Sequence, residues 1–120
     1  MGISREISLK KRPQFLRVYE KGRKMNCRTF VIYWLNNCEE KRFGFTVSRK
    51  IGNAVIRNRV KRRLGELVRK HQGRFEDGTW FVFNAKRRTA WALFSELEAD
   101  FEVFFQGAHE KASADSHQRV

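Results

Sequence analysis

The chain has 120 residues, the size of one ordinary domain, and its 41% apolar residues can bury a core, which excludes a wholly disordered basic protein. Its 26 Lys and Arg against 13 Asp and Glu give a net charge of +13, and a small folded domain with such an excess normally binds a polyanion. Nucleic acid is the leading candidate partner, with an anionic membrane surface second.

The first predicted element is a short helix between Pro13 and Gly22. Proline suits the first helical position because its missing N–H costs nothing there, and glycine suits the position just past the end. Between them, apolar residues recur at helical spacing: Phe15, Leu16, Val18 and Tyr19.

Two strands are predicted next. Residues 28–35 are dense in β-branched and aromatic side chains, so both faces of this strand are apolar. The face without a helix cover must then be a cleft or a partner site. Residues 42–47 predict a second strand, joined to the first by a short polar hairpin loop. Gly44 and Thr46 share one of its faces, so we expect that side of the sheet to be shallow.

The second half of the chain predicts a long helix, a third strand and a last helix. The long helix spans about residues 54–71, with an apolar stripe on one side and basic residues on the other. Residues 80–84 predict a strand that pairs parallel to a neighbour through this helix. The last helix follows, and small polar residues predict a disordered tail over 107–120. The result is an α+β sandwich of order α-β-β-α-β-α, one domain over residues 1–106.

The sequence shows no catalytic or metal-binding constellation. Cys27 and Cys38 fit neither a disulfide framework nor a metal-ligand spacing, and no Gly-rich phosphate loop is present. No histidine has a serine or cysteine partner at a suggestive spacing. The N-terminus lacks the apolar core of a signal peptide, and no stretch approaches the roughly twenty apolar residues of a membrane span. We therefore expect a reducing cytoplasm as the location.

The most informative stretch is residues 47–64. Residues 1–70 have a net charge of +15 and residues 71–120 of −2, and no acidic residue lies between 41 and 65. The stretch turns through Gly52 and Asn53 into the long helix, so cations lie beside helix N-terminal amides, a good phosphate site. Its Arg-Asn-Arg segment adds planar groups that can bridge phosphates or hydrogen-bond RNA 2′-hydroxyls. The alternative is an ordinary solvated basic helix.

Residues 45–62, FTVSRKIGNAVIRNRVKR, resemble the signature of the bacterial ribonuclease P protein component. The similarity extends to the first helix and strand and covers roughly residues 9–106. It implies a ribosomal-protein-S5-domain-2-like sandwich with a left-handed β-α-β crossover, against the usual right-handed rule. It also implies the small subunit of a ribonucleoprotein endonuclease that removes 5′ leaders from precursor tRNA.

The resemblance implies two binding surfaces and no catalytic residue on the protein. The catalyst is the RNA subunit working with Mg²⁺, which is held mainly by the RNA and the substrate, not by a protein metal site. The expected partners are this RNA and precursor tRNA, with no membrane and no obligate protein partner. The residues expected to contact the RNA subunit are Arg49, Lys50, Asn53, Arg57, Asn58, Arg59, Lys61 and Arg62.

The second implied surface is a cleft between the first helix and the sheet, which holds the single-stranded leader. Aromatic stacking suits leaders of varied sequence because every base offers a flat face. The implied leader-binding residues are Phe15, Arg17, Tyr19 and Tyr33. For the aromatic ones the alternative is plain core. For the whole chain the alternative is a ribosomal or other structural RNA-binding protein.

Overall fold

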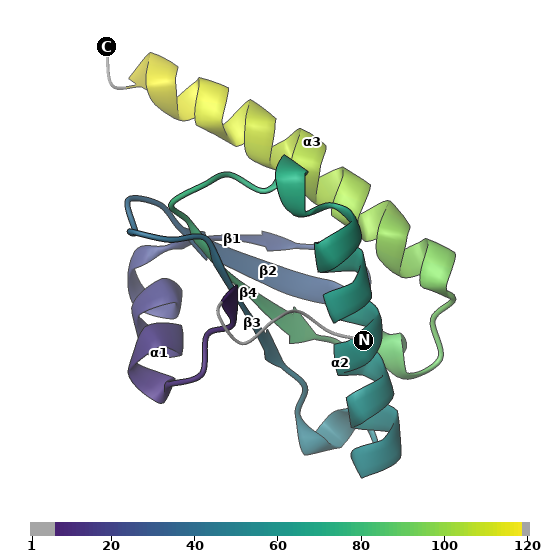
Figure 1. The fold of residues 1–120 in the computed structure, drawn as a ribbon. Helices are drawn as coiled ribbons and strands as arrows, with labels where there is room; N and C mark the ends of the chain where they lie inside the picture. The colour runs from purple at the N-terminus through teal and green to yellow at the C-terminus, as the bar shows by residue number, and fades with distance from the viewer. Residues whose placement is uncertain (1–6, 119–120) are drawn as a thin grey trace.

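The computed structural model describes residues 7–118, an α+β fold in which helices pack on a four-stranded mixed sheet (Figure 1). Short 3₁₀ turns connect several elements: η2 (Arg49–Ile51), η3 (Gln72–Arg74) and η4 (Arg87–Ala90). The main elements are α1 (Arg12–Lys21), β1 (Arg23–Asn26), β2 (Phe30–Leu35), β3 (Arg42–Thr46), α2 (Ala54–Lys70), β4 (Trp80–Ala85) and α3 (Phe94–Gln118).

The strands lie in the order β1-β2-β4-β3. β3 and β4 are parallel neighbours joined through α2, which confirms the pairing expected for the third predicted strand. The predicted hairpin between the first two strands is wrong, because β4 lies between β2 and β3 and pairs antiparallel with β2. The loop after β2 therefore passes the end of β4, so β2 and β3 run in opposite directions without being neighbours.

The observed order is α-β-β-β-α-β-α, with one strand more than predicted. The additional strand β1 has the sequence Arg-Lys-Met-Asn, which has neither the apolar alternation nor the β-branched residues of a typical strand. It is an edge strand that pairs antiparallel with β2, so tertiary pairing and not local preference determines it. The last helix was expected to end by residue 106, whereas α3 extends to Gln118. The domain boundary at residue 106 stays a prediction, and residues 119–120 lie outside the described part.

The main core lies between the sheet and the pair α2 and α3. Alternate residues of β2 are buried on this side, and its aromatic rings pack edge to face with those of neighbouring elements. The buried residues of β2 thus all point to one face of the sheet, and the apolar stripes of α2 and α3 pack against that face. The largest fully buried side chains here are Phe30, Phe43, Phe83, Phe101, Ile32, Leu64, Leu67, Leu97, Val60 and Val68.

The opposite face of the sheet is covered by α1, over a small second core of Leu9, Val18 and Val82. The helix can approach closely because of Gly22 at its end: a Cβ there would lie 2.5 Å from the carbonyl oxygens of Val18 and Trp34. Because this core is small, the residues around it are only partly buried, and the sheet presents a shallow accessible surface beside α1.

Polar contacts fasten α3 to the rest of the fold. The buried carboxylate of Asp100 accepts hydrogen bonds from the backbone N–H of Thr29 at 2.7 Å and from its hydroxyl at 2.5 Å. At the end of α2, hydrogen bonds from Lys70 and then His71 lower the pKa of Glu98. Asp100 thus attaches α3 to the β1–β2 connection, and Glu98 attaches α3 to the end of α2.

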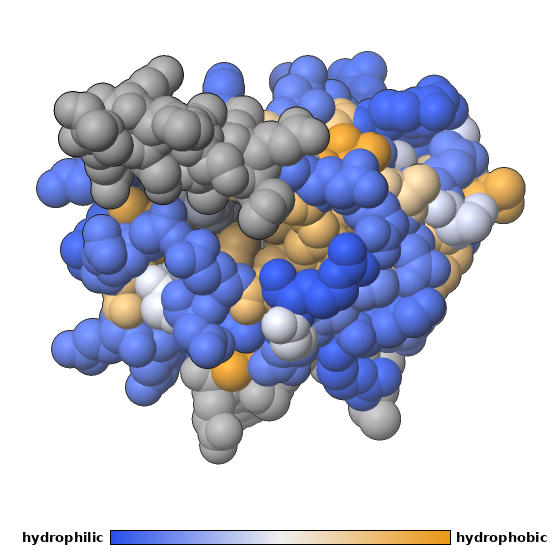
Figure 2. All heavy atoms as spheres, turned by 90° about the horizontal axis from the view of Figure 1, so that it is seen from above, coloured by the Kyte–Doolittle hydropathy of each residue, from blue (hydrophilic) through white to orange (hydrophobic). Residues whose placement is uncertain are grey.

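The molecular surface is mainly hydrophilic on the face that Figure 2 shows, with hydrophobic residues exposed in separate places. In the described part of the chain, no helix is long and apolar enough to cross a membrane. Among the residues whose burial is described, the large hydrophobic side chains that are exposed are Leu16, Val55, Trp91, Leu93 and Val103.

Candidate nucleic-acid interface

The start of α2 gathers cations beside backbone amides. In η2 the side chain of Ile51 is buried and anchors the turn, while Arg49 and Lys50 remain exposed. The side-chain oxygen of Asn53 caps the helix by accepting a hydrogen bond from the backbone N–H of Ile56 at 3.0 Å. Because the first amides of a helix carry partial positive charge, this corner combines two exposed cations with a positive helix end. Its chemistry suits an anion such as a phosphate group.

One side of α2 presents polar and basic side chains to solvent, while Val60 and Leu64 on the other side are fully buried. Arg57 is half-buried, and within the described part of the chain its Nε is buried without a hydrogen-bond partner. A cationic helix face of this kind can neutralise several phosphates of a nucleic acid at once. The members of the expected set that are exposed on α2 itself are Asn58, Arg59, Lys61 and Arg62.

Two arginines of α2 hold the loop that leads into α3. Arg59 donates from Nη2 to the carbonyl oxygen of Ala90 at 2.7 Å, and Arg63 donates from Nη1 to that of Ala92 at 2.9 Å. Arg59 therefore positions a loop in addition to its expected role at the surface. Arg63 was absent from the expected set, although its position four residues after Arg59 places both on one side of the helix.

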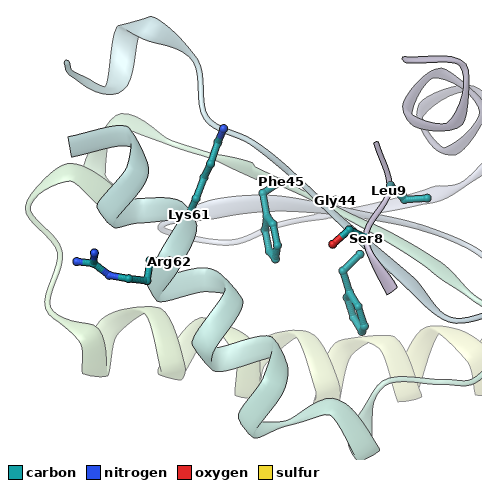
Figure 3. A pocket seen from close by; sticks show the side chains of 7 residues that line it. Ser8, Leu9, Gly44, Phe45, Lys61 and Arg62 are labelled. Carbon is teal, nitrogen blue, oxygen red and sulfur yellow. The ribbon is translucent and has the colours of Figure 1, made fainter. Parts of the chain in front are cut away.

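A groove of about 380 Å³ lies between β3 and α2. Figure 3 shows Phe45 and Ser8 on the sheet side of this groove, with Lys61 and Arg62 extending from α2 in different directions. β3 is at the edge of the sheet, and Ser8 forms an isolated parallel bridge with Phe43 of this strand. The basic face of α2 thus continues into a groove with an aromatic wall.

The α1 side of the sheet brings together three of the residues expected at the leader. The rings of Tyr19 and Tyr33 meet edge to face, with centroids 4.8 Å apart. The Tyr19 hydroxyl donates to Oδ1 of Asn84 at 2.8 Å and lies 3.2 Å from Oγ1 of Thr46. Phe15 packs over the bare backbone of Gly44. These aromatic rings are half-buried, so they form both the wall of the α1 core and an accessible surface.

Arg17, the fourth residue expected at the leader, lies apart from this aromatic group. Its guanidinium is 5.7 Å from the ring centroid of Trp80, at the opposite end of β4 from Asn84. A hollow of about 500 Å³ opens there, lined by residues of both charges. Arg49 and Lys50, by contrast, follow three and four residues after Thr46, whose Oγ1 lies 3.2 Å from the Tyr19 hydroxyl.

Asn84 and Thr46 were not expected as site residues. Both lie at the ends of strands that face α1, and only the sheet order reveals that they meet Tyr19. In the described part of the chain, no three His, Cys, Asp or Glu side chains gather closely enough to hold a metal ion.

Comparison with known proteins gives one consistent result. The family model described as ribonuclease P matches residues 3–109. A ribonuclease P protein component of Alkaliphilus metalliredigens is 41% identical over 92 residues, covering 76% of this chain and 83% of the relative. One of Syntrophomonas wolfei is 33% identical over 107 residues, covering 88% and 90%.

Solved structures agree with these relatives. The RNase P protein of Staphylococcus aureus at 2.0 Å has a TM-score of 0.77 with this chain at 30% identity, and the match covers 85% of this chain and 94% of that one. The RNase P protein of Thermotoga maritima, at 24% identity, shares the fold with a TM-score of 0.73 over 82% of this chain and 94% of its own.

Proposed function

Since this chain belongs to the ribonuclease P protein family and is the protein subunit of ribonuclease P, an endoribonuclease of tRNA processing, we propose that it has two RNA-binding surfaces. Its partner is the RNA subunit of ribonuclease P. One proposed surface, on α2, binds this RNA. The other, between α1 and the sheet, binds the 5′ leader of precursor tRNA.

The RNA-subunit surface consists of the corner at the start of α2 and the exposed side of that helix. Its support is the density of cations in a stretch of sequence without Asp or Glu from residue 41 to 65, together with the positive end of the helix. Phosphates bind at the corner, and the Arg-Asn-Arg segment bridges neighbouring phosphates and 2′-hydroxyls. The residues assigned to it are Arg49, Lys50, Asn53, Arg57, Asn58, Arg59, Lys61 and Arg62.

The leader surface consists of Phe15, Tyr19 and Tyr33, with Arg17 at its far end. Its support is the half-buried state of the two tyrosines, which leaves ring surface for an unpaired base. Arg49 and Lys50 follow in the chain shortly after Thr46, which lies beside Tyr19, and supply cations for the phosphates of a strand bound here. The protein residues bind and orient the leader, while the RNA subunit and its Mg²⁺ supply the chemistry of cleavage.

The proposal extends to the details of the fold that the family implies, namely a left-handed β3–α2–β4 crossover. It also assigns the protein a contribution to Mg²⁺ dependence: neutralising RNA phosphates lowers the Mg²⁺ concentration that the assembled enzyme needs.

The family match over residues 3–109 is the observation on which this function rests most. Reconstitution with the RNA subunit at low Mg²⁺ tests it, with precursor tRNA and mature tRNA as paired substrates. We expect the protein to restore cleavage and to tighten binding of the precursor much more than of the mature tRNA. A structural RNA-binding protein would bind RNA without any preference for the leader, and that result would contradict the proposed leader surface.

A further inference from the structure

The loop between β4 and α3 presents a tryptophan to solvent next to the arginines of α2. Trp91 is 72% exposed and Leu93 is 65% exposed, whereas Thr89 and Ala92 in the same loop are buried. An indole left in water contributes little to folding, and tryptophan is enriched where proteins contact their partners. The alternation of buried and exposed residues shows that the loop is packed and that Trp91 is directed outward by it.

The loop is held in place by hydrogen bonds from α2 and from within. Arg59 and Arg63 donate to the carbonyl oxygens of Ala90 and Ala92. The hydroxyl of Thr89 donates to the carbonyl oxygen of Lys86 at 2.7 Å. A fixed loop loses little conformational entropy when its exposed ring meets a partner, so Trp91 is preorganised for contact.

The surroundings of Trp91 are strongly basic. η4 adds the exposed Arg87 and Arg88, of which Arg88 is 3.5 Å from Glu96. Next to the indole is a hollow of about 460 Å³, large enough for one flat base. The excess of cations favours a polyanion over an apolar protein surface. The hollow is lined by Arg59, Arg62, Arg63 and Glu66 of α2 and by residues 90–94 of the loop.

We propose that Trp91 stacks on an unpaired base of the ribonuclease P RNA. The inference depends on the proposed function, because Arg59 and Arg62 belong both to the α2 surface and to the hollow beside the indole. An RNA strand whose phosphates contact these two arginines passes next to Trp91. Stacking on an indole is sequence-tolerant and complements the phosphate contacts of α2, which do not engage a base.

The test measures binding of the full chain to the RNA subunit, without tRNA, for the wild type and loop variants. Trp91→Ala should weaken binding about five- to hundredfold, the range expected for loss of one stacked base. Trp91→Phe should restore most of the affinity because it keeps a flat ring, and Trp91→Leu should not. Val103→Ala is the matched control, since it removes an exposed apolar side chain on α3, outside the lining of the hollow, and should change affinity less than twofold.

Two further readouts separate stacking from other causes. The slope of affinity against salt should be the same for Trp91→Ala and wild type, because no phosphate contact is lost. The fluorescence of Trp91, taken as the difference between wild type and Trp91→Phe, should be quenched by the RNA and protected from acrylamide.

Unchanged affinity and unquenched fluorescence, in a protein that still binds through α2, would overturn the Trp91 inference alone. Failure of the wild type to bind the RNA would overturn the proposed function and the inference together. A reduced salt slope for Trp91→Ala, or a change in self-association without a change in RNA binding, would replace base stacking by another role for Trp91 and so overturn the inference.

Discussion

The hydroxyl of Tyr19 on α1 donates a hydrogen bond to Oδ1 of Asn84 at the end of β4. The two residues are far apart in sequence. Their hydrogen bond fixes the orientation of the Tyr19 ring, which contacts the Tyr33 ring edge to face. The Tyr19 hydroxyl is therefore hydrogen-bonded within the protein, and the two half-buried rings keep exposed surface for a ligand. This arrangement makes the two tyrosines separable by mutation, because only Tyr19 has this polar tether.

Tyr33→Ala should weaken binding of leader-bearing precursor tRNA by the assembled enzyme far more than binding of mature tRNA. Loss of one stacked base corresponds to roughly 1–3 kcal/mol, and stacking contributes only when a single strand is present. Tyr33→Phe keeps the ring and serves as the control. Paired affinity measurements with the two substrates decide the question. Equal losses for both substrates would mean that Tyr33 is simply part of the α1 core.

Gly44→Ala should destabilise the protein through Phe15. A Cβ at Gly44 would lie 2.7 Å from Cε1 and Cζ of the Phe15 ring, so the half-buried ring must move, at a cost of about 1–3 kcal/mol. Gly73→Ala is the matched control because, in the part of the chain that the structure describes, no atom beyond the adjacent residues lies within 4 Å of that Cβ. Urea denaturation measures each free energy of unfolding.

The Phe15→Ala background isolates the Gly44 contact. Once the ring is removed, Gly44→Ala should cost much less, and the double-mutant cycle should give a clear coupling energy. If the losses of unfolding free energy from Phe15→Ala and Gly44→Ala simply add, contact with the Phe15 ring is not the reason that Gly44→Ala destabilises the protein.

Replacing Arg57 and Arg59 together with Ala should weaken binding to the RNA subunit and flatten its dependence on salt. If each arginine contacts one phosphate, the slope of log affinity against log salt falls by between about one and two. Affinity measured over a series of salt concentrations gives this slope. An unchanged slope would remove the segment from the interface.

Arg59 requires its own control, because it also donates to the carbonyl of Ala90. Arg63→Ala removes the companion bond to Ala92 and perturbs the same loop. If the salt slope of RNA affinity falls more in the Arg57 and Arg59 double variant than in Arg63→Ala, the difference reports lost phosphate contacts and not displacement of the loop.

The sequence predicted local features of this fold better than its long-range ones. The α2 face could be predicted because a helix of fixed period assigns Val60 and Leu64 to one side and Asn58 to the other. The sheet order could not, since insertion of β4 between β2 and β3 is decided by contacts distant in sequence. The contact of Tyr19 with Asn84 depends on that order, and so it was missed as well.

The two cysteines should react at very different rates with a thiol reagent. Burial, and then the charge of Asp100, raises the pKa of Cys27 to about 11, so this thiol stays protonated at pH 8. Cys38 is only half-buried, although burial raises its pKa as well. We expect Cys38 to be labelled first and Cys27 only on unfolding. Cys38→Ser should abolish the faster phase, and rapid labelling of that variant would contradict the buried position of Cys27.

Folding of the free protein should respond to anions that occupy the corner at the start of α2. The net charge of +15 on residues 1–70 produces self-repulsion, which low salt leaves unscreened. An anion held by Arg49, Lys50 and the helix end binds only the folded state and stabilises it by mass action. At a hundred times its dissociation constant it contributes roughly 2.7 kcal/mol, a large share of the stability of a small domain.

Sulfate or pyrophosphate at millimolar concentration should therefore raise the unfolding midpoint more than chloride at the same ionic strength. The excess should shrink when Arg49, Lys50 and Arg57 are neutralised to Gln, because the bound anion loses its partners. The control neutralises three other exposed cations, Arg12, Lys21 and Arg28, which lowers the net charge equally but leaves the corner intact. Screening responds to net charge alone, so an equal response of both triple variants would show that no specific phosphate site exists at the start of α2.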